Sequence, residues 1–193
     1  MRKDAKGKIH FKIVFTGASL SGKTTVLKYL HDSVDGLMKG GLTSIADPSG
    51  RTVYFDFSPF SATNTVLFDV YTVAGQRRHK NQRKMILRGV DGLLFVADSR
   101  PEMKDDNVEA AVELREFLGD KIGGDIPLVI VLNKRDLPEV MGREQMLEDL
   151  AFSNDILAIN TIATKGIGIK QAFQAVSREI IMKQVYKTDT VEA

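Results

Sequence analysis

The sequence predicts an α/β fold built on a mostly parallel six-stranded sheet, with one antiparallel edge strand and helices on both faces. Short apolar, β-branched segments alternate with helical segments along the chain, which is typical of parallel sheets assembled from βαβ units. Two of the apolar segments are close enough in the sequence to form a hairpin, which places an antiparallel strand at the edge. Because a parallel sheet is buried on both faces, helices are expected on each side of it.

Length and composition fit one globular domain. The chain has 193 residues, of which 43% are hydrophobic and 27% are charged. We expect a single domain over residues 1–193, with a basic arm at residues 1–8 and a frayed tail at residues 188–193. The net charge of +2 is too small to indicate a nucleic-acid or membrane partner. Because cysteine is absent, prenyl and palmitoyl anchors are excluded, and we expect a cytoplasmic protein with no lipid anchor of its own.

The order of the elements follows from the apolar pattern. The expected strands are residues 9–15, 52–57, 65–71, 89–97, 126–132 and 155–161. The expected helices are residues 23–34, 80–87, 107–118, 143–150 and 169–184. The turn of the hairpin is expected at residues 59–64. Residues 35–50 are rich in Gly, Ser, Pro and Asp and are expected to form one long loop, a feature that is usually functional in a compact domain.

Residues 17–24 match the phosphate-binding pattern G-x-x-x-x-G-K-[ST] in full. They follow a predicted strand and open a predicted helix, which is the context that this motif needs. Its glycines allow backbone N–H groups to point at phosphates, where Lys23 is expected to reach the β- and γ-phosphates and Thr24 to bind Mg²⁺. The expected nucleotide contacts are Gly17, Ala18, Ser19, Leu20, Ser21, Gly22, Lys23, Thr24 and Thr25. The motif indicates a P-loop NTPase and leaves the base and the reaction open.

Residues 133–136, which read Asn-Lys-Arg-Asp, follow directly on an apolar strand and indicate guanine. The Asp136 carboxylate can accept hydrogen bonds from N1 and N2 of guanine, a donor pair that adenine lacks. Asn133 can hold neighbouring loops by side-chain hydrogen bonds, and the stem of Lys134 can lie on the face of the base. A solvated turn is the alternative, and the phosphate motif upstream argues against it.

The order of these motifs resembles that of the Ras-like small GTPases across nearly the whole chain, which implies a Ras-like G domain. The matching segments are the P-loop, Thr52, Ala74-Gly75-Gln76, Asn133-Lys134-Arg135-Asp136 and Ile162-Ala163-Thr164. Within that superfamily the chain looks most like the MglA-like GTPases of prokaryotes, which govern cell polarity and motility in bacteria. That closer likeness is carried by residues 20–25, 51–52, 55–57, 71–76, 86–92, 133–138 and 163–166.

The resemblance implies further nucleotide and metal contacts. Ala163, with Thr164 beside it, would present a backbone N–H to O6 of guanine. Thr52 would bind Mg²⁺ together with Thr24 and sense the γ-phosphate. Gly75 would contact the γ-phosphate through its backbone.

The resemblance also implies the catalytic set. Gln76 would orient the attacking water, and Lys23 would supply positive charge at the phosphates. In MglA-like proteins the arginine at the position of Arg51 acts as an arginine finger in cis, and a solvated loop arginine is the alternative here.

Two departures from the common Ras pattern affect the chemistry. Thr72 replaces an Asp that holds Mg²⁺ in most relatives, although Thr is typical of the MglA-like group, and Asp56 or Asp69 is the candidate substitute. Ser19 replaces a Gly beside the γ-phosphate and could crowd Gln76. These departures leave open a second function, a nucleotide-gated scaffold with negligible hydrolysis, which single-turnover GTP hydrolysis would separate from a GTPase.

Residues 35–52 and 73–84 are expected to act as two switch loops that γ-phosphate orders. Expected partners are GTPase-activating and exchange proteins, a roadblock-fold regulator that the MglA likeness implies, and effectors at the two loops. For the basic second switch, recognition of an acidic partner competes with a solvated face and with anionic lipid. Its basic residues are Arg77, Arg78, His79, Lys80, Arg83, Lys84 and Arg88.

Nucleotide choice can be tested at Asp136. Asp136→Asn should lose the preference for guanine and gain one for xanthine, because xanthine has a carbonyl where guanine has its amino group. The mismatch should weaken GDP binding by roughly 1–3 kcal/mol, the cost of an unmatched buried polar pair. Competition between GDP and XDP measures the change, and a variant that still prefers GDP would show that the base contact is misassigned.

Overall fold

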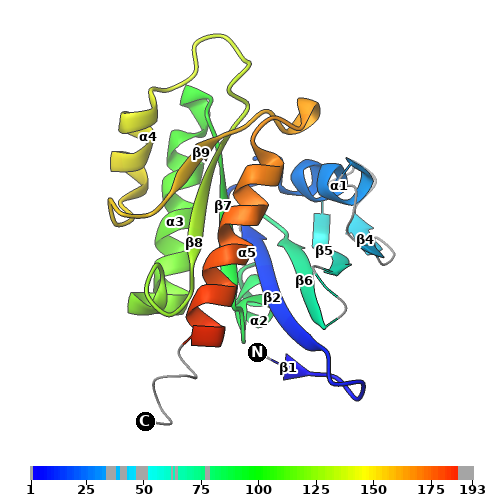
Figure 1. Cartoon of the computed structure of the whole chain (residues 1–193). Helices are drawn as coiled ribbons and strands as arrows, with labels where there is room; N and C mark the ends of the chain where they lie inside the picture. Colours follow the sequence, from blue (N-terminus) through cyan, green and yellow to red (C-terminus); the bar gives the residue numbers. More distant parts are fainter. Residues whose placement is uncertain are drawn as a thin grey trace.

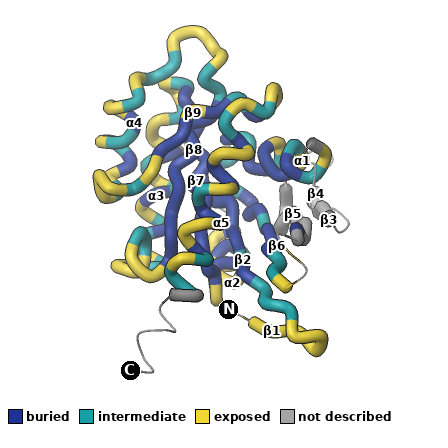
Figure 2. The backbone as a smooth tube through the Cα atoms, viewed as in Figure 1, coloured by how far each residue is buried: buried dark blue, intermediate teal, exposed yellow. Residues whose placement is uncertain are grey.

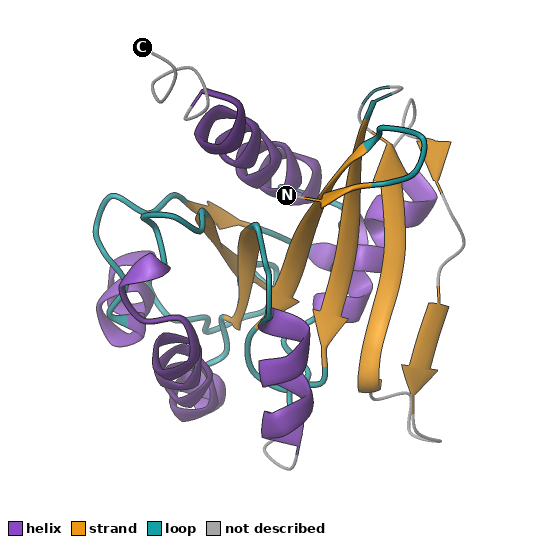
Figure 3. Ribbon diagram, turned by 90° about the horizontal axis from the view of Figure 1, so that it is seen from below, coloured by secondary structure: helices purple, strands orange, loops and turns teal. Residues whose placement is uncertain are grey.

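The computed structural model describes residues 2–33, 38–39, 43–46, 52–61, 63, 65–76 and 79–186; for residues 33, 38–39, 43–46, 52–59, 61 and 185–186 it describes the backbone alone. Within these residues one sheet of nine strands runs through the molecule, with helices on both faces (Figures 1 and 3). Its core strands, in spatial order, are β5 (Thr52–Ser61), β6 (Val66–Val73), β2 (Ile9–Thr16), β7 (Gly92–Asp98), β8 (Leu128–Asn133) and β9 (Ala158–Asn160). Neighbouring core strands are parallel except for the antiparallel β5–β6 pair, which confirms the predicted six-stranded α/β core.

The helices divide between the two faces of the sheet, and Figure 2 shows the buried strands between them. Side chains of α1 (Lys23–Ser33) and α5 (Ile169–Tyr186) belong to one apolar core. Side chains of α2 (Lys80–Leu87), α3 (Lys104–Leu118) and α4 (Arg143–Leu150) belong to the other. Among the described residues, no helix combines the length and the apolar character needed to cross a bilayer.

Aromatic side chains fill the core between β2, β5, β6 and α5. Phe173 of α5 lies 5.5 Å from Phe60 and 5.8 Å from Phe68, measured between ring centroids. Phe11 lies 5.9 Å from Phe68. Successive strand residues point to opposite faces, so Val14 joins the other core while Phe11 joins this one.

Parts of the segments expected as a long loop and a turn, residues 35–50 and 59–64, form strands at the outer edge of the sheet. β3 (Met38–Lys39) and β4 (Thr43–Ala46) lie within residues 35–50 and pair antiparallel with β5. They satisfy backbone groups that an edge strand would otherwise expose. β5 itself continues through residues 59–61, where the turn was expected, and Pro59 pairs with Asp69. The remainder of the predicted loop lies outside the described residues, as does the tail at residues 188–193.

Residues 1–8, expected as a basic arm, contain a short strand. β1 (Arg2–Lys3) pairs antiparallel with the start of β2. The guanidinium of Arg2 donates to Oδ2 of Asp69 at 3.0 Å, and Nδ1 of His10 lies 3.0 Å from the same oxygen. The side chains of residues 2–7 remain exposed, so the segment is a solvated hairpin attached to the sheet.

The aromatic core gives a stability prediction. Phe173→Ala should lower the free energy of unfolding by about 3–5 kcal/mol, because the surrounding rings cannot close the cavity fully. Met182→Ala, at a 46% exposed position of the same helix, is the matched control and should change it by less than about 0.5 kcal/mol. Denaturant melts measure both, and equal effects would contradict the packing described here.

Candidate functional site

The predicted phosphate loop joins β2 to α1 at the carboxyl edge of the parallel strands (Figure 1). Gly17 and Gly22 have φ angles of +126° and +105°, which L side chains rarely adopt. A Cβ on Gly17 would lie 2.2 Å from the backbone oxygen of Val96, and one on Gly22 would lie 2.3 Å from Nδ2 of Asn133. Both positions therefore require glycine, and the loop is pressed against β7 and β8.

Lys23 is buried, and its ammonium group lies against the loop. Nζ donates to the carbonyl oxygens of Gly17 at 3.0 Å and Ala18 at 2.6 Å. Thr24, which is half-buried, and Thr25, which is exposed, continue α1. A positive charge therefore stands at the amino end of a helix, where backbone N–H groups already favour an anion.

Asn133 connects three loops through its buried side-chain amide. Nδ2 donates to the carbonyl oxygen of Ser21 at 2.8 Å. Oδ1 accepts from the hydroxyl of Thr161 at 3.1 Å and from the backbone N–H of Ala163 at 3.0 Å. The expectation that Asn133 holds neighbouring loops is confirmed. The N–H that the resemblance assigns to guanine O6 is the one that Asn133 accepts in this structure.

Lys134 is oriented by Asp98, a residue that sequence reasoning missed. Lys134 has a φ of +65°, and its Nζ lies 2.6 Å from Oδ2 of Asp98. The Asp98 side chain is 0% exposed and also accepts from the guanidinium of Arg100 at 2.8 Å. Burial raises the pKa of Asp98, but hydrogen bonds from Arg100 and Lys134 outweigh it and leave the pKa below its ordinary value. The available signal was a charged residue that ends an apolar strand.

The loops on the base side meet around η4 (Ala163–Lys165). Nζ of Lys165 lies 3.7 Å from Oδ2 of Asp136. Gly166, with a φ of +72°, follows η4, and a Cβ there would lie 1.8 Å from the ring of Tyr29 on α1. Thr164, in the middle of η4, is exposed. The structure thus brings residues 133–136 and 163–164 to the same edge as the phosphate loop.

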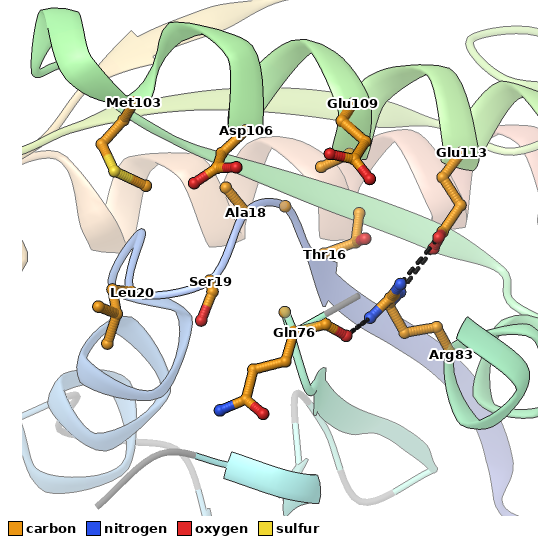
Figure 4. A pocket seen from close by; sticks show the side chains of 13 residues that line it. Thr16, Ala18, Ser19, Leu20, Gln76, Arg83, Met103, Asp106, Glu109 and Glu113 are labelled. Carbon is orange, nitrogen blue, oxygen red and sulfur yellow. Dashed lines mark hydrogen bonds and ion pairs between the residues drawn. The ribbon is translucent and has the colours of Figure 1, made fainter. Parts of the chain in front are cut away.

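The second switch lies directly against the phosphate loop. A Cβ on Gly75 would lie 2.6 Å from both N and Cα of Ser19, so only glycine allows this approach. Ser19, Leu20 and Gln76 line one cavity of about 370 Å³, whose opposite wall is α3 (Figure 4). Gln76 is half-buried and its side chain extends away from Arg83 (Figure 4).

The two carboxylates expected as substitutes at the metal site, Asp56 and Asp69, lie on the neighbouring strands β5 and β6. Asp69 is wrong as a substitute for the missing carboxylate, because it lies three residues before Thr72 and therefore on the opposite face of β6, where it contacts Arg2 and His10. Backbone register places Asp56 opposite Thr72. Its side chain lies outside the described residues, as do the side chain of Thr52 and all of Arg51. In the described part, no three His, Cys, Asp or Glu residues form a metal-binding group.

The oxygen chemistry at this edge fits Mg²⁺. Thr24 is half-buried at the start of α1, and the Thr72 hydroxyl is fully buried at the end of β6. Hydroxyl oxygens are hard ligands that Mg²⁺ accepts together with phosphate oxygens and water.

The basic second switch is in part an internal structure. Nζ of Lys80 lies 2.9 Å from Glu116, and Arg83 pairs with Glu113, both on α3. His79 is buried, and Lys84 and Arg88 are exposed. Arg77 and Arg78 lie outside the described residues. Among the described members of this set, His79 and Arg83 are therefore internal, and Lys80, Lys84 and Arg88 remain exposed.

Comparisons with known proteins cover the whole site. The model of the ADP-ribosylation factor family matches residues 1–180. The chain is 39% identical over 180 residues to the mutual gliding-motility protein MglA of Myxococcus xanthus (strain DK1622), covering 90% of this chain and 91% of that protein. It is 29% identical over 182 residues to ADP-ribosylation factor-like protein 6 of Caenorhabditis elegans, covering 90% and 88%. The solved Arl6 BBS3 small GTPase from Trypanosoma brucei, with the bound nucleotide analogue GppNp, shares the fold with a TM-score of 0.70 at 18% identity, covering 91% of this chain and 100% of that one.

The Asp98–Lys134 pair predicts an effect on nucleotide release. Asp98→Asn should speed GDP dissociation roughly tenfold, since a charge-assisted hydrogen bond contributes about 1.5–3 kcal/mol. The same pair predicts a pH dependence of stability, because the pKa of Asp98 is lowered on folding. The stability that ionised Asp98 contributes is complete at pH values above the ordinary carboxyl pKa, and it is lost as the pH falls through the lowered pKa. Fluorescent GDP release measures the first effect and thermal melts across pH the second. Glu102→Gln removes an exposed partner of Arg100 and should change neither; equal changes in both variants would contradict the role of Asp98.

Proposed function

Because the chain belongs to the ADP-ribosylation factor family and is a Ras-like small GTPase of the MglA type, we propose that it is a cytoplasmic switch that binds GTP and GDP with Mg²⁺ and hydrolyses GTP slowly. The observation that carries this proposal is the link through Asn133. One buried amide joins the phosphate loop at Ser21 to the base-side loop at Ala163. A guanine nucleotide laid along this edge would meet a phosphate cradle at one end and Asp136 at the other.

The phosphate end would stabilise negative charge. Lys23 lies at the carbonyls of the phosphate loop and would reach the β- and γ-phosphates of a bound nucleotide. Thr24 and Thr52 would hold Mg²⁺, with Asp56 as the nearby carboxylate, and the bound ion would neutralise charge on the phosphate oxygens. Gly75, whose backbone touches Ser19, would sense the γ-phosphate.

The base end would select guanine. Asp136 would accept from N1 and N2, and the Lys134 stem, held by Asp98, would cover one face of the ring. Ala163 would share its N–H between Asn133 and O6. Thr164, next to Ala163, would also lie beside the base.

Hydrolysis would rest on Gln76 and Arg51, with Gln76 orienting water and Arg51 bringing positive charge in cis. Ser19 lines the same cavity as Gln76, which supports slow intrinsic turnover (Figure 4). Partners would be GTPase-activating and exchange proteins, a roadblock-fold regulator among them, and effectors that read the two switch loops. Polarity, motility or trafficking would be the process that such a switch controls.

Catalysis is tested by two substitutions in different switches. Gln76→Leu and Arg51→Ala should each lower single-turnover GTP hydrolysis at least tenfold, a loss of about 1.4 kcal/mol of transition-state stabilisation. GDP affinity should stay nearly unchanged, because neither residue is expected to touch the base or the α- and β-phosphates. The Arg51 effect should be largest with an activating partner that moves the first switch.

The outcomes separate the parts of the proposal. Wild-type turnover of Arg51→Ala, both alone and with its partner, would make the cis finger wrong and favour a finger in trans. A wild-type protein that binds GTP but does not hydrolyse it would establish the scaffold instead. A protein that binds ADP as well as GDP would contradict the guanine assignment.

A further inference from the structure

We propose that Arg83 is a positioning residue for GTP hydrolysis, whose guanidinium, fixed by Glu113, holds the backbone on both sides of Gly75 and thereby sets the place of the Gln76 side chain. The inference rests on the proposed role of Gln76. It assigns a function to a buried ion pair that the nucleotide contacts do not use.

The geometry of the Arg83 guanidinium carries the inference. Nη1 donates to the carbonyl oxygen of Ala74 at 2.9 Å and to that of Gln76 at 2.5 Å. Nη2 and Nε donate to the two carboxylate oxygens of Glu113 on α3, at 2.8 Å and 2.5 Å. Figure 4 shows Arg83 between α3 and the backbone of Gln76. One planar group thus connects the backbone of the second switch to α3.

The two carbonyls flank the residue that touches the phosphate loop. Gly75 lies between Ala74 and Gln76, and the backbone of Ser19 fills the space that a Cβ on Gly75 would need. Fixing the carbonyl on either side limits rotation of both peptide units. The direction in which Gln76 leaves the backbone is therefore determined by Arg83 on one side and by Ser19 on the other.

The hydrogen bonds of Arg83 to Glu113 and to the two switch carbonyls form a clamp, and its burial requires an arginine at this position. The side chains of Arg83 and Glu113 are 8% and 17% exposed. A buried charge that loses its partner is strongly destabilised, so each side chain holds the other in one geometry. The planar fork of arginine can meet a carboxylate with two nitrogens and still present a third to the carbonyls, which a lysine ammonium cannot do.

A neighbouring ion pair offers a matched control. Lys80 and Glu116 join the same two helices at 2.9 Å, with side chains 51% and 54% exposed. The Lys80 ammonium donates to Glu116 on α3, whereas the Arg83 guanidinium also donates to the switch backbone. Glu116→Gln therefore removes an α2–α3 ion pair without removing the clamp.

The test measures single-turnover GTP hydrolysis, GTP and GDP affinity and thermal midpoint in nucleotide-bound protein. Arg83→Met and Glu113→Gln should each slow hydrolysis at least tenfold while both affinities stay within about twofold. Glu116→Gln should hydrolyse at the wild-type rate. Glu113→Gln keeps the shape of the site, so it still tests the inference if Arg83→Met does not fold.

A double-mutant cycle separates positioning from general stability. If Arg83 acts through Gln76, adding Arg83→Met to Gln76→Leu should slow hydrolysis less than twofold further. A further tenfold loss in that background, or wild-type rates in both Arg83→Met and Glu113→Gln, would overturn the inference. If Gln76→Leu alone is as fast as wild type, the proposed function loses its water-orienting residue and this inference falls with it. A slow Gln76→Leu beside fast clamp variants overturns the clamp alone.

Discussion

The hydrogen bonds of the Asn133 side chain are the interaction on which the rest of the site depends. A buried amide that loses a partner is destabilised by about 1–3 kcal/mol, so the segments that satisfy it have one favoured arrangement. Asn133 reaches Ser21, 112 residues earlier in the chain, and Thr161 and Ala163 on the other side. The phosphate loop and the base-side loop are therefore held in one frame by hydrogen bonds within the chain.

The second switch is attached to that frame by different means. Close packing sets the distance between Gly75 and Ser19, and the buried Arg83–Glu113 pair sets the orientation of the backbone around Gly75. Phosphoryl transfer requires positioning and charge stabilisation more than covalent chemistry, so under the proposed function these contacts would affect the rate of hydrolysis. Under the proposed function, the base side would need a fixed geometry to select guanine, whereas the second switch would change with the γ-phosphate.

Most of the fold and the motif residues could be predicted because their signals are local. Apolar periodicity predicts the strands, and the glycines of the phosphate loop follow from a need for positive φ that one residue type meets. The expectations that failed concerned which strands pair and which face of the sheet a side chain occupies. Residues 35–50 contain two short strands because β5 offers them an edge. Asp69 was a candidate for the metal although three positions along a strand turn a side chain to the opposite face.

By itself the sequence predicted an α/β fold with a guanine-nucleotide site, because its phosphate and base motifs require particular residue types at fixed spacing, while its resemblance to small GTPases implied the hydrolysis. The comparisons support the same family. Only the tertiary structure decided how the flanking charges are used. Asp98 and Arg83 look like ordinary members of charged segments until the fold places Lys134 beside one and Glu113 beside the other. Ion pairs between distant segments leave no local pattern, since each partner is selected by burial and orientation that exist only in the folded chain.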